Sequence, residues 1–404
     1  MNKTLILILD PNKDISKEVQ IHSDLIIKDI KNFFAEKFRN EFSMENSESD
    51  ILSYFFRNYS FGEITVSIEQ DVLSHKEDMY ILTGLDNIAV IEELRKSTGI
   101  NVYVLAYTPN ISKIENNQTF DKDILDIYLI ADYYLNPYLE IKTVRNEFQR
   151  FLDLISGEPA VSIPRNEEIN MYMAYTAMYN SHCLSRAVGA CLTTQDHDII
   201  STGWNDVPKA GGGVYGINHN NHCFKFKNPK ISSELTPACH KDMENQNIMA
   251  EIREELKNQG IELGEKEEFI IKEIGKLQIK GLLEFSRSVH AEMHTIIKGA
   301  QMVGERIKDS ILYVTAFPCH NCARHIILSG VRVVYFLEPF IKSRAIKLHN
   351  DSLLLANQIT ESDFKKDKVF LIPFQGVGGN GFEKIFKRSG DLKLKLKENK
   401  MYQF

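Results

Sequence analysis

The chain lacks any apolar run long enough to cross a bilayer, which takes roughly 20 consecutive residues in a helix. Its first apolar stretch, residues 4–9, is short and is not followed by the small-residue cleavage site of a signal peptide. We therefore expect a protein with no membrane partner and a cytoplasmic location.

An excess of positive charge is also lacking. The 404 residues carry 48 Lys and Arg against 55 Asp and Glu, which gives a formal net charge of −7 at pH 7. A protein dedicated to nucleic acid usually presents a basic face and often a basic total. The charge balance therefore disfavours a polynucleotide partner, although it leaves room for a local basic patch.

Cysteine is scarce, with six residues in the whole chain. Disulfide frameworks belong mainly to short secreted chains, so in this chain the thiols are better explained as free cysteines or metal ligands. The six are Cys183, Cys191, Cys223, Cys239, Cys319 and Cys322.

Hydrophobic residues make up 43% of the chain, enough to bury proper cores, and the length suits two or three domains. In the first part, strand-like runs at 4–9, 79–83 and 101–106 alternate with helical patterns such as 87–96. This βαβ pattern predicts a parallel sheet with covering helices. A stretch with two prolines and little periodicity follows, so we place the first domain at residues 1–160.

The second part predicts a three-layer α/β/α domain over residues 165–388, with a helical insertion at about 205–285 and a tail at 389–404. We expect an α/β fold overall. The elements expected in the second domain are helices at 167–182, 290–302 and 319–330, strands at 187–194, 198–202, 311–315 and 331–337, and two solvated helices within 242–280.

Two short motifs carry the chemistry. The first places His290 two residues before Glu292, and the second, Pro-Cys-His-Asn-Cys at residues 318–322, places Cys319 and Cys322 three residues apart. One imidazole and two thiolates are ligands that zinc prefers, and three protein ligands leave a fourth position open for water. Cysteines at this spacing share one face of the first helical turn, where the helix dipole favours thiolates.

This set predicts hydrolytic deamination. Zinc lowers the pKa of a bound water to roughly 7, and a carboxylate beside it can move protons in the reaction. We predict that His290, Cys319 and Cys322 bind Zn²⁺ and that Glu292 is the catalytic acid and base. The Cys-x-x-Cys motif alone is also compatible with a redox pair or half of a structural zinc site, and His-x-Glu alone is commonplace, but the combination is the established signature of zinc deaminases.

Around these motifs the sequence resembles the cytidine and deoxycytidylate deaminase superfamily. The resemblance extends to residues 186–190 (Arg-Ala-Val-Gly-Ala) and 203–205 (Gly-Trp-Asn). It implies that Asn205 contacts the sugar hydroxyl of the substrate; the alternative is that Asn205 only shapes a turn. Arg186 and Lys209 are further candidates for substrate binding, because cationic donors match phosphate oxygens.

Further segments resemble the bacterial anti-phage dCTP deaminases. Members of that group join a kinase-like P-loop domain to a C-terminal deaminase and deplete deoxycytidine nucleotides. The resemblance implies a hydrolase that converts dCTP, dCMP or both to deoxyuridine nucleotides, with a homo-oligomer such as a hexamer, a dNTP effector, and a regulatory RNA or phage trigger. The segments are residues 205–213, 317–325, 338–343, 348–352 and 373–378.

Three other functions stay open on the sequence. They are deamination of bases within RNA or DNA, which needs a way to hold an extruded base; a housekeeping dCMP deaminase that feeds thymidylate synthesis; and a binding module with an inert zinc site. A second zinc site formed by Cys223, Cys239 and His240 is a further hypothesis, with free cysteines as the alternative.

The N-terminal part is similar to the kinase-like domain of that group at residues 83–87 (Thr-Gly-Leu-Asp-Asn) and 131–136. It contains no G-x-x-x-x-G-K-[ST] motif, and the first strand leads instead into Asp-Pro-Asn-Lys at residues 10–13. We therefore expect a degenerate P-loop domain with a kinase-like fold and no kinase activity.

Overall fold

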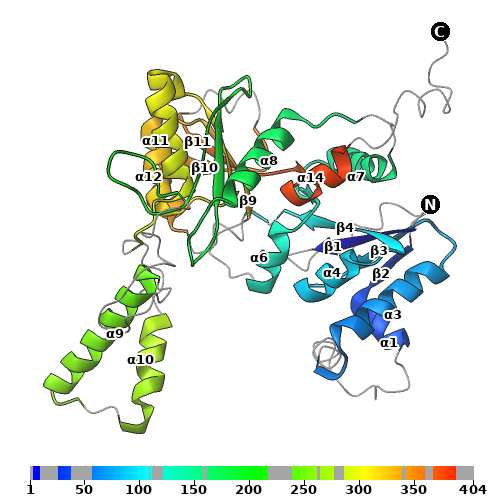
Figure 1. The fold of residues 1–404 in the computed structure, drawn as a ribbon, viewed down its shortest axis with the longest axis horizontal. Coiled ribbons are helices and arrows are strands. Elements are labelled where there is room, and N and C mark those ends of the chain that lie inside the picture. The colour runs from blue at the N-terminus through cyan, green and yellow to red at the C-terminus, as the bar shows by residue number, and fades with distance from the viewer. Residues whose placement is uncertain are drawn as a thin grey trace.

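The computed structural model describes residues 3–9, 26–37, 57–108, 110–111, 122–157, 162–216, 239–261, 264–276, 286–338, 343–359 and 367–387. These residues form a mixed α/β fold with two six-stranded sheets, each dominated by parallel strands (Figure 1). The predicted α/β class is confirmed. None of the described helices combines the length and the apolar content needed to cross a membrane.

The N-terminal sheet has the strand order β12-β5-β4-β1-β3-β2. Its first five strands along the chain run parallel, and β12, which comes from the C-terminal end of the described residues, pairs antiparallel with β5. The strands are β1 (Lys3–Leu9), β2 (Ile26–Asp29), β3 (Met79–Thr83), β4 (Ile100–Tyr107), β5 (Tyr133–Leu135) and β12 (Gly376–Val377).

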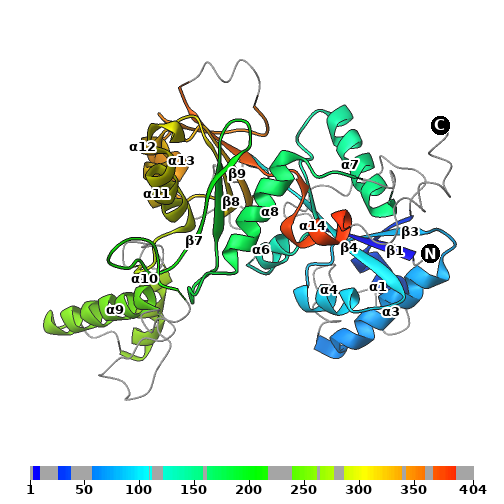
Figure 2. The same cartoon turned by 45° about the horizontal axis from the view of Figure 1, so that its top comes forward.

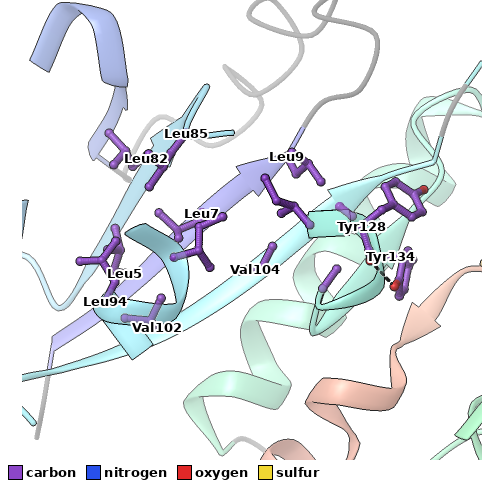
Figure 3. Close-up of a cluster of buried hydrophobic side chains, with 14 of the residues drawn as sticks. Leu5, Leu7, Leu9, Leu82, Leu85, Leu94, Val102, Val104, Tyr128 and Tyr134 are labelled. Atoms are coloured by element: carbon purple, nitrogen blue, oxygen red, sulfur yellow. Dashed lines mark hydrogen bonds between the residues drawn. The ribbon is translucent and has the colours of Figure 1, made fainter. Parts of the chain in front are cut away.

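Strand β1 is buried on both faces, which explains its unbroken apolar sequence. Leu5, Leu7 and Leu9 face one side, where they pack in the cluster shown in Figure 3. Ile6 and Ile8 face the other side. The leucine side is covered by α1 (Ile30–Lys37), α3 (Phe61–Ser74), α4 (Ile88–Arg95) and α6 (Lys122–Leu129), and the isoleucine side by α7 (Ile141–Ser156) and α14 (Gly379–Phe386).

The second sheet has the strand order β10-β11-β9-β8-β6-β7. Strand β6 pairs antiparallel with both neighbours, and the remaining pairs are parallel. Helices α11 (Ala291–Val303) and α12 (His320–Ser329) cover one face, and α8 (Asn166–Met178) covers the other, giving three layers (Figure 1). The strands are β6 (Gly189–Thr193), β7 (Ile199–Trp204), β8 (Ile311–Ala316), β9 (Val333–Glu338), β10 (Leu353–Leu355) and β11 (Val369–Pro373), and a short helix, α13 (Ala345–Leu348), precedes β10.

Helix α8 links the two sheets. Met171, Ala174 and Tyr175 lie in the same buried cluster as Leu5 of the N-terminal sheet and Tyr313 of the second sheet. The two sheets therefore share one continuous core.

Two helices project from this body as a hairpin, as Figures 1 and 2 both show. Helix α9 (His240–Asn258) has no buried residue, and it packs on α10 (Glu267–Lys276), where Ile271 is buried. Arg253 and Glu267 form an ion pair at 2.7 Å between the two helices. The two solvated helices expected within residues 242–280 are thus present.

Candidate active site

The three predicted metal ligands meet at the N-terminal ends of two helices. His290 is the N-cap of α11, and Cys319 is the N-cap of α12, with Cys322 in the first turn. The Cys319 sulfur accepts a hydrogen bond from the Cys322 backbone N–H at 3.4 Å, so this thiol replaces the usual oxygen of an N-cap. The alternation of strand and helix in the sequence therefore brings the two motifs together.

The donor atoms of the trio fit a tetrahedral zinc ion. The Nδ1 atom of His290 lies 3.3 Å from the sulfur of Cys319 and 3.3 Å from the sulfur of Cys322. Ligand lengths of roughly 2.0 Å for nitrogen and 2.3 Å for sulfur place tetrahedral donors about 3.6 Å apart. Within the described part of the chain, this trio is the one group of three such side chains close enough to hold a metal ion.

The thiols and the imidazole shift each other's protonation. A hydrogen bond with the Cys322 thiol and the neighbouring His290 together lower the pKa of Cys319 to about 4, against the effect of burial. Burial acts to lower the pKa of His290, but the Cys319 thiolate outweighs it and raises that pKa to about 9. Burial raises the pKa of Cys322. The pair of Cys319 and His290 is thus already ionised, and metal binding at this site releases protons.

Glu292 lies in the first turn of α11, and its side chain is almost fully buried. Burial, helped by the charge of Cys319, raises the pKa of Glu292 to about 7. A carboxyl group with a pKa near neutrality can both accept and donate a proton at physiological pH. The residue therefore combines the position and the acidity expected of the predicted acid and base.

Two contacts fix the segments that carry the ligands. The backbone N–H of Val289 donates to the carbonyl of Asp206 at 2.9 Å, and the Asp206 carboxylate lies 2.8 Å from Nδ1 of His182. On the cysteine side, the hydroxyl of Ser343 donates to the carbonyl of Pro318 at 2.7 Å. These roles could not be predicted from the sequence, because the partners are 24 or more residues apart.

A cavity of about 200 Å³ opens in front of the trio. His290, Glu292 and Cys319 form its inner end, and Val188 and Phe317 supply apolar walls. The outer part is lined by residues from three separate segments: Cys183–Arg186, Cys239–Lys241 and Ser286–Ser288. Apart from Arg186, the sequence had not pointed to the cations of this outer part.

Asn205 lines the cavity, but its amide is engaged in the local structure. The side-chain oxygen accepts from the backbone N–H of Val188 at 2.7 Å and from the hydroxyl of Ser181 at 2.9 Å, and the side-chain nitrogen donates to the carbonyl of Arg186 at 2.7 Å. These bonds hold together the turn that follows β7. One amide hydrogen is left for a ligand, so a sugar contact and a structural role are compatible.

The other candidates are placed differently. Arg186 lines the cavity and forms an ion pair with the buried carboxylate of Glu338. Lys209 is exposed in the glycine-rich turn and is not among the residues that line the cavity. Of the hypothetical second zinc site, Cys239 and His240 line the cavity, whereas Cys223 lies outside the described residues.

A zinc-ligand trio with a buried carboxyl group two residues from one ligand defines the site of the hydrolytic zinc deaminases. Residues 164–338 match the cytidine and deoxycytidylate deaminase zinc-binding region, so this part of the chain is similar to that superfamily.

Individual relatives match the same part of the chain. The deoxycytidylate deaminase of Enterobacteria phage T2 is 27% identical over 182 residues, which are 43% of this chain and 80% of the relative. The deoxycytidylate deaminase of Enterobacteria phage T4 is 26% identical over 179 residues, which are 43% of this chain and 78% of the relative. The crystal structure of dCMP deaminase from the cyanophage S-TIM5 in complex with dCMP and dUMP is similar over 53% of this chain and 99% of that one, with 17% identity and a TM-score of 0.29.

Proposed function

We propose that the protein is a zinc-dependent hydrolytic deaminase that converts deoxycytidine nucleotides to deoxyuridine nucleotides. The observation that carries this proposal is the meeting of His290, Cys319 and Cys322 beside one cavity, which His290 and Cys319 line, with Glu292 buried next to them. Zinc held by the trio would supply a Lewis acid that makes water nucleophilic at neutral pH.

The residues of the chain supply the remaining chemistry. Val188 and Phe317 offer apolar surface to a flat pyrimidine ring. Glu292 takes a proton from the attacking water and delivers it to the ring nitrogen, and a second proton goes to the amine that leaves as ammonia. One water is consumed and one ammonia is released for each cytosine converted to uracil.

A free nucleotide is favoured over a base within a polynucleotide. The negative net charge gives no general attraction for a nucleic-acid backbone. The relatives from phages T2 and T4 are named as deoxycytidylate deaminases.

The same names favour a second candidate, a dCMP deaminase that feeds thymidylate synthesis. Depletion of dCTP in defence against phage is the alternative that follows from the sequence resemblance. Ammonia release from dCMP, dCTP, deoxycytidine and single-stranded DNA, each with and without added dNTPs, tests the proposal. We expect turnover of dCMP, dCTP or both; turnover of the polynucleotide alone would contradict it.

We further propose that residues 1–160 form a kinase-like domain without kinase activity. The parallel sheet around β1 and the absent P-loop motif support this proposal. Calorimetric titration of the full chain with ATP and Mg²⁺ tests it. Tight ATP binding that persists in the presence of excess dCMP and dCTP would contradict the degeneracy.

A further inference from the structure

The residues that line the cavity become more exposed from its inner to its outer end. Glu292 at the inner end is 4% exposed, whereas Arg287 at the outer end is exposed and Lys241 is half-buried. A nucleotide has the same polarity, since its ring is flat and neutral and its phosphate carries the charge. A ring that reaches the metal trio therefore directs its phosphate towards the outer end.

The cations of the outer end differ in their partners. Arg186 is paired with Glu338, and on the projecting hairpin Arg253 is paired with Glu267. Within the part of the chain that the structure describes, neither Lys241 nor Arg287 has a carboxylate partner. The charge of Arg287 acts on its surroundings, because it adds to burial in lowering the pKa of His240.

The N-terminal end of helix α9, which is the positive end of its dipole, lies at the outer end of the cavity. Cys239 is its N-cap and makes no side-chain capping hydrogen bond, and Cys239, His240 and Lys241 all line the cavity. The N-terminal end of a helix of this length attracts anions through its backbone N–H groups and its dipole. The first turn of this helix carries one acidic residue, Asp242, and the charge of Glu244, one turn further along, also acts on His240.

We propose that Lys241 and Arg287, together with the N-terminal end of α9, bind the 5′ phosphate of the substrate. This inference rests on the proposed function and assigns its specificity for nucleotides over nucleosides to the helical insertion. The projecting hairpin then takes part in substrate binding, because the first turn of α9 completes the wall of the cavity.

The test compares Lys241→Ala, Arg287→Ala and the double variant with Lys257→Ala. Lys257 is exposed in the last turn of the same helix, roughly 24 Å from Lys241 at 1.5 Å per residue. The quantity measured is kcat/KM for dCMP divided by kcat/KM for deoxycytidine. A charge-assisted hydrogen bond is worth roughly 10- to 100-fold, so we expect each single variant to lower this ratio by about 10-fold or more through KM, and Lys257→Ala to leave it unchanged.

Equal losses on dCMP and deoxycytidine, or no loss, would overturn the assignment. Calorimetric binding of dCMP and of an oligodeoxycytidylate separates this inference from the proposed function. If the wild-type protein releases no ammonia but binds dCMP, and the double variant does not, the phosphate site stands and the deaminase proposal fails. If dCMP binding is unaffected by the double substitution while oligonucleotide binding falls, the cations serve a nucleic-acid backbone and the inference is wrong.

Discussion

At the scale of single residues, the proposed role of Glu292 differs from that of the three predicted ligands, because it moves protons and does not hold the metal ion. Its burial raises its pKa to about 7 and leaves it beside the ligands. We predict that Glu292→Gln lowers kcat by roughly 10²- to 10⁴-fold while the bound zinc per chain stays the same. Steady-state rates with metal analysis by mass spectrometry check this, and a variant that keeps most of its turnover would remove Glu292 from the chemistry.

The opposite pattern is expected for a ligand. Cys322 is fully buried between His290 and Cys319, so Cys322→Ala should lose metal and activity together. Metal content after dialysis against a mild chelator measures the loss. Cys191 provides the control, because it is equally buried but packs in the core under α8. Zinc content that falls in Cys191→Ala as much as in Cys322→Ala would show a folding defect in place of a ligand.

The sequence pointed to His290, Glu292, Cys319 and Cys322, which the structure brings together, because each of the two motifs spans only a few residues and leaves a local pattern. It did not identify Lys241, Arg287 or Asp206 as parts of the site. Lys241 and Arg287 line the cavity from a long insertion and the segment that follows it, and Asp206 acts through contacts across 24 or more residues, such as that with His182. Spacing along the chain carries no information about such contacts.

At the scale of elements, the approach of α11 to β7 depends on a missing side chain. A Cβ on Gly203 would lie 2.4 Å from the hydroxyl oxygen of Thr295 and 2.9 Å from its backbone nitrogen. We predict that Gly203→Ala displaces α11, whose N-cap is the predicted ligand His290, and costs about 1–3 kcal/mol in the free energy of unfolding. Urea unfolding followed by far-UV circular dichroism measures this cost.

Gly62→Ala is the matched control. This glycine lies in α3, and a Cβ there meets nothing within 4 Å. The substitution should leave the midpoint unchanged or raise it, since Ala favours helix over Gly by up to about 1 kcal/mol. A Gly203 variant as stable as this control would show that α11 can move without cost.

Most central elements were predictable because their residues are apolar with the right period. The expected helix at 319–330 is α12, which ends at Gly330 with positive φ. The expected helix at 167–182 is shorter, because α8 ends at Met178. Short strands such as β2, β10 and β12 were not predicted, since two to four residues give no recognisable period.

At the scale of the whole molecule, Glu168 joins three segments. Its carboxylate, fully buried, accepts two hydrogen bonds from Arg150 of α7 at 2.7 and 2.8 Å and one from the backbone N–H of Val377 in β12 at 2.8 Å. Removal of one partner of a buried ion pair costs roughly 3–5 kcal/mol. We predict that Glu168→Ala lowers the unfolding midpoint strongly, whereas Glu93→Gln, which loses an exposed pair with Lys96, hardly changes it.

The shared core also predicts a single unfolding transition. Trp204 is the only tryptophan in the sequence and lies in the second sheet, so its fluorescence reports that half. Far-UV circular dichroism reports the whole chain. We expect the two urea curves of the wild-type protein to coincide. Separate midpoints would show that the two sheets unfold independently despite the cluster around α8.

The return of β12 and α14 to the N-terminal sheet has a consequence for dissection of the chain. A protease cut between α7 and α8 would leave one fragment with five strands of that sheet and another that carries its sixth strand and the helix packed on its isoleucine side. The two fragments should stay associated and copurify. Chimaeras that join one half of this chain to the other half of a homologue should fold poorly. In such chimaeras the strand edge of one half would lack the matching strand that its own other half supplies.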